Sequence, residues 1–119
     1  MTRVFLFLVG LAGCAHQPGT PSSPPQAAPV RDTRPKLPRA EAKAVVLAEL
    51  TTPTTDAAVL SAGEVLADAK CVRCHEMEAP AAYGRGDWED ILPEMLRESR
   101  VDATEARAIS AWVLAGAGK

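Results

Sequence analysis

The chain has 119 residues and a formal net charge of −2, from 13 basic and 15 acidic side chains. Residues 61–119 carry eleven acidic and seven basic side chains, a balance that argues against nucleic acid as a partner. The sequence offers no Ser-His-Asp set, no evident carboxylate pair and no Gly-rich phosphate loop. We therefore do not expect an enzyme with its own side-chain catalytic machinery, and the three cysteines become the most informative residues.

The N-terminus predicts a cleaved signal peptide over residues 1–13. Arg3 precedes a short apolar stretch over residues 4–9, which is too short to span a bilayer. Residues 11–14 read Leu-Ala-Gly-Cys and resemble the bacterial lipoprotein box. The resemblance implies lipidation of Cys14, and two or more acyl chains anchor a protein stably. Ala15 follows where inner-membrane lipoproteins of Gram-negative bacteria carry aspartate, which favours the outer membrane. The alternative is an ordinary signal peptide with an incidental cysteine.

Residues 14–38 are expected to form a disordered tether. Seven of the ten prolines lie in residues 15–38, with few apolar side chains larger than alanine. The end of this stretch is basic, with Arg31, Arg34, Lys36 and Arg39 against Asp32. A solvated basic run is the favoured interpretation, and contact with anionic headgroups is the alternative.

Residues 39–51 contain good helix formers and predict a helix, with Pro38 suited to its first turn. Residues 51–55 read Thr-Thr-Pro-Thr-Thr and predict a break. Residues 39–56 are therefore expected to be a helix and a linker. The pattern leaves open whether this helix packs on the following domain.

Residues 57–119 are expected to hold the chemistry. Residues 71–75 read Cys-Val-Arg-Cys-His, the pattern of covalent c-type haem attachment. Two thiols at this spacing can reach the two vinyl groups of one porphyrin edge, which leaves His75 under the iron as its fifth ligand. The alternatives are a thioredoxin-like pair, which needs a βαβ setting, half of a zinc site, and chance. A small domain with so few aromatic residues also fits a fold that is completed by a buried cofactor.

Three helices are expected in residues 57–119. The first has Ser61 as N-cap, Glu64 closing a capping box and Leu60 packing on Val65, and it runs into Cys71.

The second helix has Asp87 as a candidate N-cap and an apolar face opposite a polar one, with Pro93 expected to kink or restart it. The apolar face comprises Trp88, Ile91, Leu92, Met95 and Leu96, and the polar face Glu89, Asp90, Glu94, Arg97 and Glu98. The third begins after Asp102, with Glu105 at the box position, and stops at Gly116.

Residues 60–116 resemble a small class I cytochrome c. Gly63 lies eight residues before Cys71, and Trp112 matches the aromatic that packs near that glycine in the family. Trp88, Ile91 and Met95 resemble the Trp-x-x-Ile-x-x-x-Met run of some bacterial haem domains, which precedes a helix matching residues 104–106. Pro80 departs from the pattern, since it lies closer to the motif than the family's proline whose carbonyl receives the histidine N–H. The resemblance implies an all-α haem domain with one covalent haem c.

Met95 is the expected sixth ligand of the iron. Met77 is too close to His75 to reach the distal side, and His16 lies in the tether. The bland alternative is that Met95 is only a core residue. Trp88 is expected beside the cofactor. Arg85 could reach a haem propionate, and the simpler alternative is that the Gly84-Arg85-Gly86 turn is a loop hinge.

These observations predict a lipid-anchored, periplasm-facing monohaem cytochrome that carries single electrons between unidentified redox partner proteins. The alternatives are a five-coordinate haem domain that binds or senses a small ligand, and a haem-bearing subunit of a larger envelope complex.

We expect Cys14→Ser to move the protein from the detergent-soluble membrane fraction to a soluble or unprocessed form, because the variant lacks the acylated thiol. Fractionation and mass spectrometry of the mature N-terminus measure this. An unmodified N-terminus that starts at another residue contradicts the lipoprotein interpretation.

Overall fold

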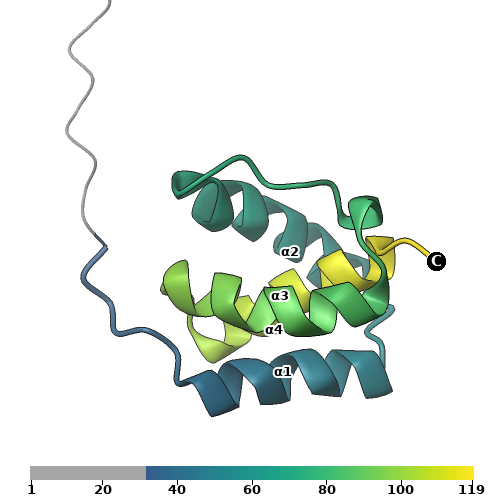
Figure 1. Ribbon diagram of the computed structural model, residues 1–119, viewed down its shortest axis with the longest axis horizontal. Coiled ribbons are helices and arrows are strands. Elements are labelled where there is room, and N and C mark those ends of the chain that lie inside the picture. The colour runs from purple at the N-terminus through teal and green to yellow at the C-terminus, as the bar shows by residue number, and fades with distance from the viewer. Residues whose placement is uncertain (1–31) are drawn as a thin grey trace, which may run out of the picture. The chain divides into compact units, whose positions relative to one another are not determined.

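The computed structural model describes residues 32–119, and the signal peptide, Cys14 and most of the expected tether lie outside this range. Four helices follow in chain order: α1 (Arg39–Thr51), α2 (Ala57–Lys70), α3 (Arg85–Glu98) and α4 (Ala103–Gly116) (Figure 1). Two short 3₁₀ turns, η1 (Cys71–Arg73) and η2 (Pro80–Ala82), lie between α2 and α3. The described part of the chain contains no strand beyond one isolated bridge, so the all-α expectation is confirmed.

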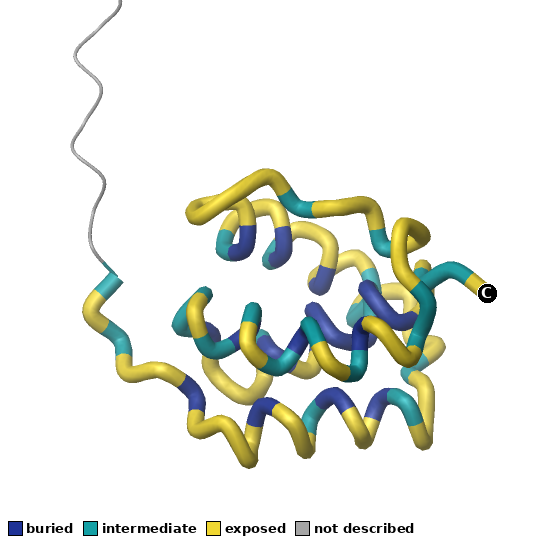
Figure 2. Tube along the Cα trace, viewed as in Figure 1, coloured by how far each residue is buried: buried dark blue, intermediate teal, exposed yellow. Residues whose placement is uncertain are grey.

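Helix α4 forms the centre of the described unit and contacts the other three helices. It carries more buried residues than any of them. In Figure 2 the dark, buried segments of the helices face the middle of the described unit. They are Ala106, Ala108, Ile109, Ser110, Ala111, Val113 and Leu114. A helix that is apolar over most of its circumference must be covered on several sides, which explains why three helices surround it.

Helices α2 and α4 cross at Gly63, as the sequence predicts. A Cβ at Gly63 would lie 2.1 Å from the Ala108 carbonyl oxygen and 2.8 Å from the Trp112 Cβ. The absence of a side chain at Gly63 therefore allows the two backbones to approach closely. The expected proximity of Gly63 and Trp112 is confirmed.

Helix α1 packs on α3 and α4, which answers the question that the sequence left open. Ala42 and Val46 are fully buried on its inner face, and Leu37 is buried just before it. The compact unit that contains α2, α3 and α4 also includes α1 and residues 32–38, the last residues of the expected tether.

The beginnings of α2 and α3 differ from the expected ones. Helix α2 starts one turn earlier, because Asp56 accepts a hydrogen bond from the Ala58 N–H (2.8 Å), and Ser61 lies inside the helix. Val65 is 65% exposed, so it makes no buried staple. Helix α3 is capped by Gly84, and the Asp87 carboxylate reaches back to the Gly84 N–H (3.0 Å) from the third helical position.

The other helix limits follow the sequence closely. Helix α3 continues through Pro93 without a restart. Asp102 caps α4 by accepting from the N–H groups of Thr104 (2.8 Å) and Glu105 (2.9 Å), and Glu105 accepts from the Asp102 N–H (3.1 Å). This capping box and the end of α4 at Gly116 are confirmed.

We expect Gly63→Ala to lower the free energy of unfolding by about 1–3 kcal/mol, because the new methyl group meets backbone of α4 rather than a movable side chain. Gly86→Ala is the matched control, since a Cβ there has no neighbour within 4 Å and alanine favours the helix. Denaturant unfolding of both variants measures the difference. Equal stability of the two variants would contradict the close crossing.

Candidate cofactor pocket

A pocket of about 390 Å³ lies between the end of α2 and the second half of α3, within the size range of small-molecule sites. Its lining residues are Cys71, Cys74, His75, Ile91, Glu94, Met95, Glu98 and Ser99. A second hollow of about 160 Å³ shares His75, Ile91 and Met95 with it and adds Glu78, Tyr83 and Trp88. The four residues that the sequence assigns to haem attachment and ligation therefore line one pocket.

The two cysteines of the pocket differ in exposure. Cys71 is buried, Cys74 is exposed, and neither forms a disulfide within the described residues. Burial raises the pKa of Cys71, and a hydrogen bond with Ser99 offsets part of this effect. A raised pKa keeps the Cys71 thiol protonated at neutral pH, unlike the thiolates typical of catalytic Cys-x-x-Cys pairs.

Two of the three alternative interpretations of the motif require surroundings that the described residues do not provide. The thioredoxin-like interpretation needs a βαβ unit, and residues 32–119 form only helices and turns. A zinc site needs further ligands, and no group of three or more His, Cys, Asp or Glu side chains within the described range lies close enough to hold a metal ion.

His75 is exposed, and its Nδ1 atom lies 2.7 Å from the Glu76 carbonyl oxygen. A carbonyl oxygen only accepts hydrogen bonds, so Nδ1 carries the proton in this arrangement. In the neutral tautomer with Nδ1 protonated, the free lone pair is on Nε2. His75 can therefore offer Nε2 to a metal ion while the backbone holds the other side of the ring.

Trp88 fixes the chain that follows the motif. Its indole N–H donates to the Pro80 carbonyl (2.8 Å), and its ring meets that of Tyr83 edge-on, with centroids 5.3 Å apart. The Pro80 carbonyl is therefore occupied by Trp88, and the His75 ring contacts the Glu76 carbonyl instead.

The C-terminal residues hold the same segment from the other side. The Gly118 N–H donates to the Tyr83 carbonyl (2.8 Å). A Cβ at Gly116 would lie 2.9 Å from the Pro80 Cβ, so the end of α4 lies directly against η2. The segment that supplies Glu78 and Tyr83 to the wall of the smaller hollow is thereby held at Pro80 and Tyr83.

Helix α3 presents two different faces. Trp88, Leu92 and Leu96 are buried in the core, whereas Ile91 and Met95 are half-buried and line the pocket. Glu94 and Glu98 line the pocket as well, although the sequence placed them on the opposite, polar face. Residues 91, 94, 95 and 98 have the i, i+3, i+4, i+7 spacing of one helix face, and this was the signal that could have found them.

Arg85 lies outside both hollows. Its guanidinium donates to the Leu114 carbonyl (3.0 Å) and the Leu50 carbonyl (3.5 Å), at the ends of α4 and α1. A cation satisfies the free carbonyl groups at helix C-termini. The larger pocket lies beside the second half of α3, so Arg85 does not join Cys71, Cys74, His75 and Met95 in it.

Three further residues were named from the sequence. Met77 is half-buried and lines neither hollow. Cys14 and His16 fall outside the described residues.

Comparison of the chain with protein-family models, curated proteins and solved structures found no match. Within residues 32–119, no helix has both the length and the apolarity needed to cross a membrane.

Proposed function

We propose that the protein is a lipid-anchored monohaem c-type cytochrome that carries single electrons between redox partners of the bacterial envelope. The observation that carries the proposal is the pocket in which two thiols, a histidine and a methionine converge. This donor set, in a pocket that also has apolar lining, fits a covalently attached haem better than a metal ion or a redox disulfide.

The residues of the pocket have distinct roles in this proposal. Cys71 and Cys74 hold the cofactor through thioether bonds, and His75 offers Nε2 as the proximal ligand. Met95 offers its thioether sulfur from α3, the wall opposite the motif. When bound, the haem supplies an iron centre that gains and loses one electron. Trp88 fills the core behind this wall, since it is almost fully buried.

Ligation by His75 and Met95 favours electron transfer over ligand binding. A thioether ligand raises the reduction potential, and two protein ligands close the iron to small molecules. Met95 is half-buried at the pocket, which suits a ligand as well as a packing residue. The experiment on Met95 must therefore distinguish a six-coordinate electron carrier from a five-coordinate haem domain that binds a small ligand.

The remaining parts of the proposal rest on the sequence. Lipidation of Cys14 anchors the protein and exposes it to the periplasm, with the outer membrane favoured. The redox partners are unidentified proteins, and the alternative role is that of a haem-bearing subunit of a larger envelope complex.

Haem attachment is tested by haem staining after denaturing electrophoresis of protein produced with the c-type maturation machinery. The wild-type band should stain, and the Cys71→Ser/Cys74→Ser variant should not, because only a covalent bond survives denaturation. Val72→Ala is the control, since Val72 lies between the cysteines but is 45% exposed. An unstained wild-type band overturns the proposal.

The iron ligands decide between electron transfer and ligand binding. With Met95 bound, the oxidised protein is low-spin with a weak far-red sulfur-to-iron band, and the reduced protein resists carbon monoxide. Met95→Ala should erase the band, lower the potential and admit carbon monoxide. Met77→Ala is the control, because Met77 lines neither hollow. A wild type that is high-spin and binds carbon monoxide readily favours the five-coordinate alternative.

A further inference from the structure

Residues 32–38 form an ordered segment, here termed the strap, which lies against the ends of three helices. Leu37 is its apolar anchor, with only 7% of its surface exposed. The Arg97 guanidinium donates to the Leu37 carbonyl (3.2 Å), and that of Arg100 donates to the Arg34 carbonyl. The strap is thus held by its backbone and by a buried side chain, as well as by the ion pairs of its charged residues.

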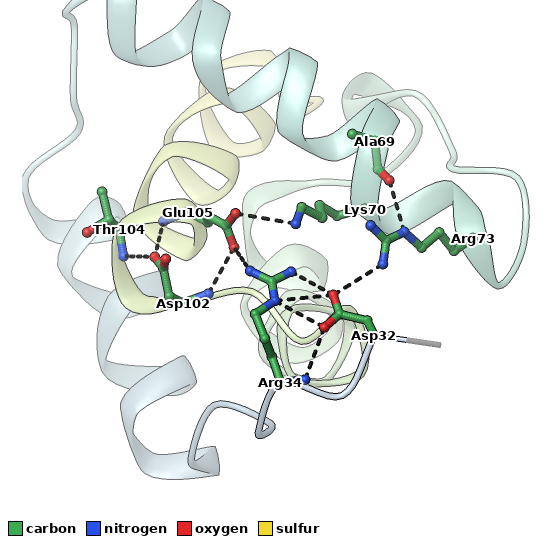
Figure 3. Close-up of polar contacts among 8 residues, drawn as sticks. All are labelled: Asp32, Arg34, Ala69, Lys70, Arg73, Asp102, Thr104 and Glu105. Carbon is green, nitrogen blue, oxygen red and sulfur yellow. Dashed lines mark hydrogen bonds and ion pairs between the residues drawn. The ribbon is translucent and has the colours of Figure 1, made fainter. Parts of the chain in front are cut away.

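At its beginning the strap contacts the attachment motif (Figure 3). The Asp32 carboxylate lies 3.3 Å from the guanidinium of Arg73, which stands between the two cysteines. Arg73 also donates to the Ala69 carbonyl (3.1 Å), so its side chain is held from two sides. The position of Arg73 is therefore tied both to α2 and to the strap.

The same network reaches the residue before Cys71. Arg34 pairs with Asp32 (2.7 Å) and with Glu105 of α4 (3.1 Å). Glu105 in turn lies 3.4 Å from Lys70, the last residue of α2 (Figure 3). The Arg34 guanidinium holds the pKa of Asp32 well below its usual range, as expected of a carboxylate that stays ionised among cations.

At its other end the strap contacts the opposite wall of the pocket. Lys36 pairs with Glu98 (2.6 Å), and Arg39, just after the strap, pairs with Glu94 (3.0 Å). Both glutamates line the pocket. Figure 1 shows this part of the chain passing the end of the molecule where α2 and α3 finish.

We propose that the strap is a positioning element that ties the wall carrying Cys71, Cys74 and His75 to the wall carrying Met95. The role assigned to these walls rests on the proposed function, whereas the mechanical link does not. Arg34, Lys36 and Arg39, the described residues of the basic run, all pair with carboxylates of the same unit. No single exposed pair is strong, so the link depends on several pairs acting with the Leu37 anchor.

The strap is tested by hydrogen exchange and mass spectrometry on the full chain, with Asp32→Asn/Lys36→Gln as the variant. This variant removes the pairs with Arg73 and Glu98 and leaves the pocket residues unchanged. We expect the amides of residues 70–75 and 94–99 to exchange roughly threefold to tenfold faster, and those of residues 106–114 to keep their rates. Asp90→Asn/Lys43→Gln is the control, because these exposed residues form no ion pair within the described unit.

A second variant, Leu37→Ala, keeps every charge and removes the anchor. It should speed exchange at both walls in the same way. Rates equal to those of the control, a uniform acceleration that includes residues 106–114, or a Leu37→Ala effect confined to the strap would each overturn the proposal. Failure of haem staining would overturn the proposed function, but the exchange rates of the variants and the control could still be compared, because hydrogen exchange does not require the cofactor.

Discussion

The close crossing of α2 and α4 at Gly63 is the constraint on which the rest of the structure depends. Helix α4 is the central element, and α2 can lie against it only where no side chain separates the two backbones. This contact fixes the direction in which α2 ends. Because Cys71 directly follows α2, the crossing also fixes where the Cys-x-x-Cys-His motif meets α3.

Helix α3 connects the core to the pocket. Its buried residues, Trp88, Leu92 and Leu96, contribute to the core shared with α1 and α4, and Ile91 and Met95 are left at the edge. A small domain with few large side chains has little apolar surface to spare. The half-buried Ile91 and Met95 therefore stand where further apolar contact would add stability, which is the role the proposed haem would fill.

The N-terminal part of the unit, the strap and α1, packs on the other helices and on the pocket walls. Helix α1 covers faces of α3 and α4 that would otherwise be exposed. The charged residues of the strap form ion pairs with both walls of the pocket. The surface ion pairs are individually weak. Their combined placement around one end of the pocket, together with the buried Leu37, gives the strap a defined position.

Features set by neighbours in the sequence could be predicted from it. The helix over residues 39–51, the capping box of Asp102 and Glu105, and the end of α4 at Gly116 depend on contacts within one turn, and the structure has them. The convergence of Cys71, Cys74 and His75 follows from their spacing. Gly63 and Trp112 were found through a family resemblance, and that prediction of a distant contact was correct.

Other features were decided only by the tertiary structure. Asp56 and Ser61 are both acceptable caps, and the sequence alone did not show that α2 could add a turn before Ser61. The side of α3 on which Glu94 and Glu98 lie depends on where the pocket opens, because a glutamate at a helix edge suits either solvent or a polar rim. Arg85 donates hydrogen bonds to free carbonyl groups at the ends of α1 and α4. Charged residues of the strap pair with residues more than 40 positions away in the sequence. Such pairings are chosen by the folded positions of the helices, and charge pattern along the chain does not encode them.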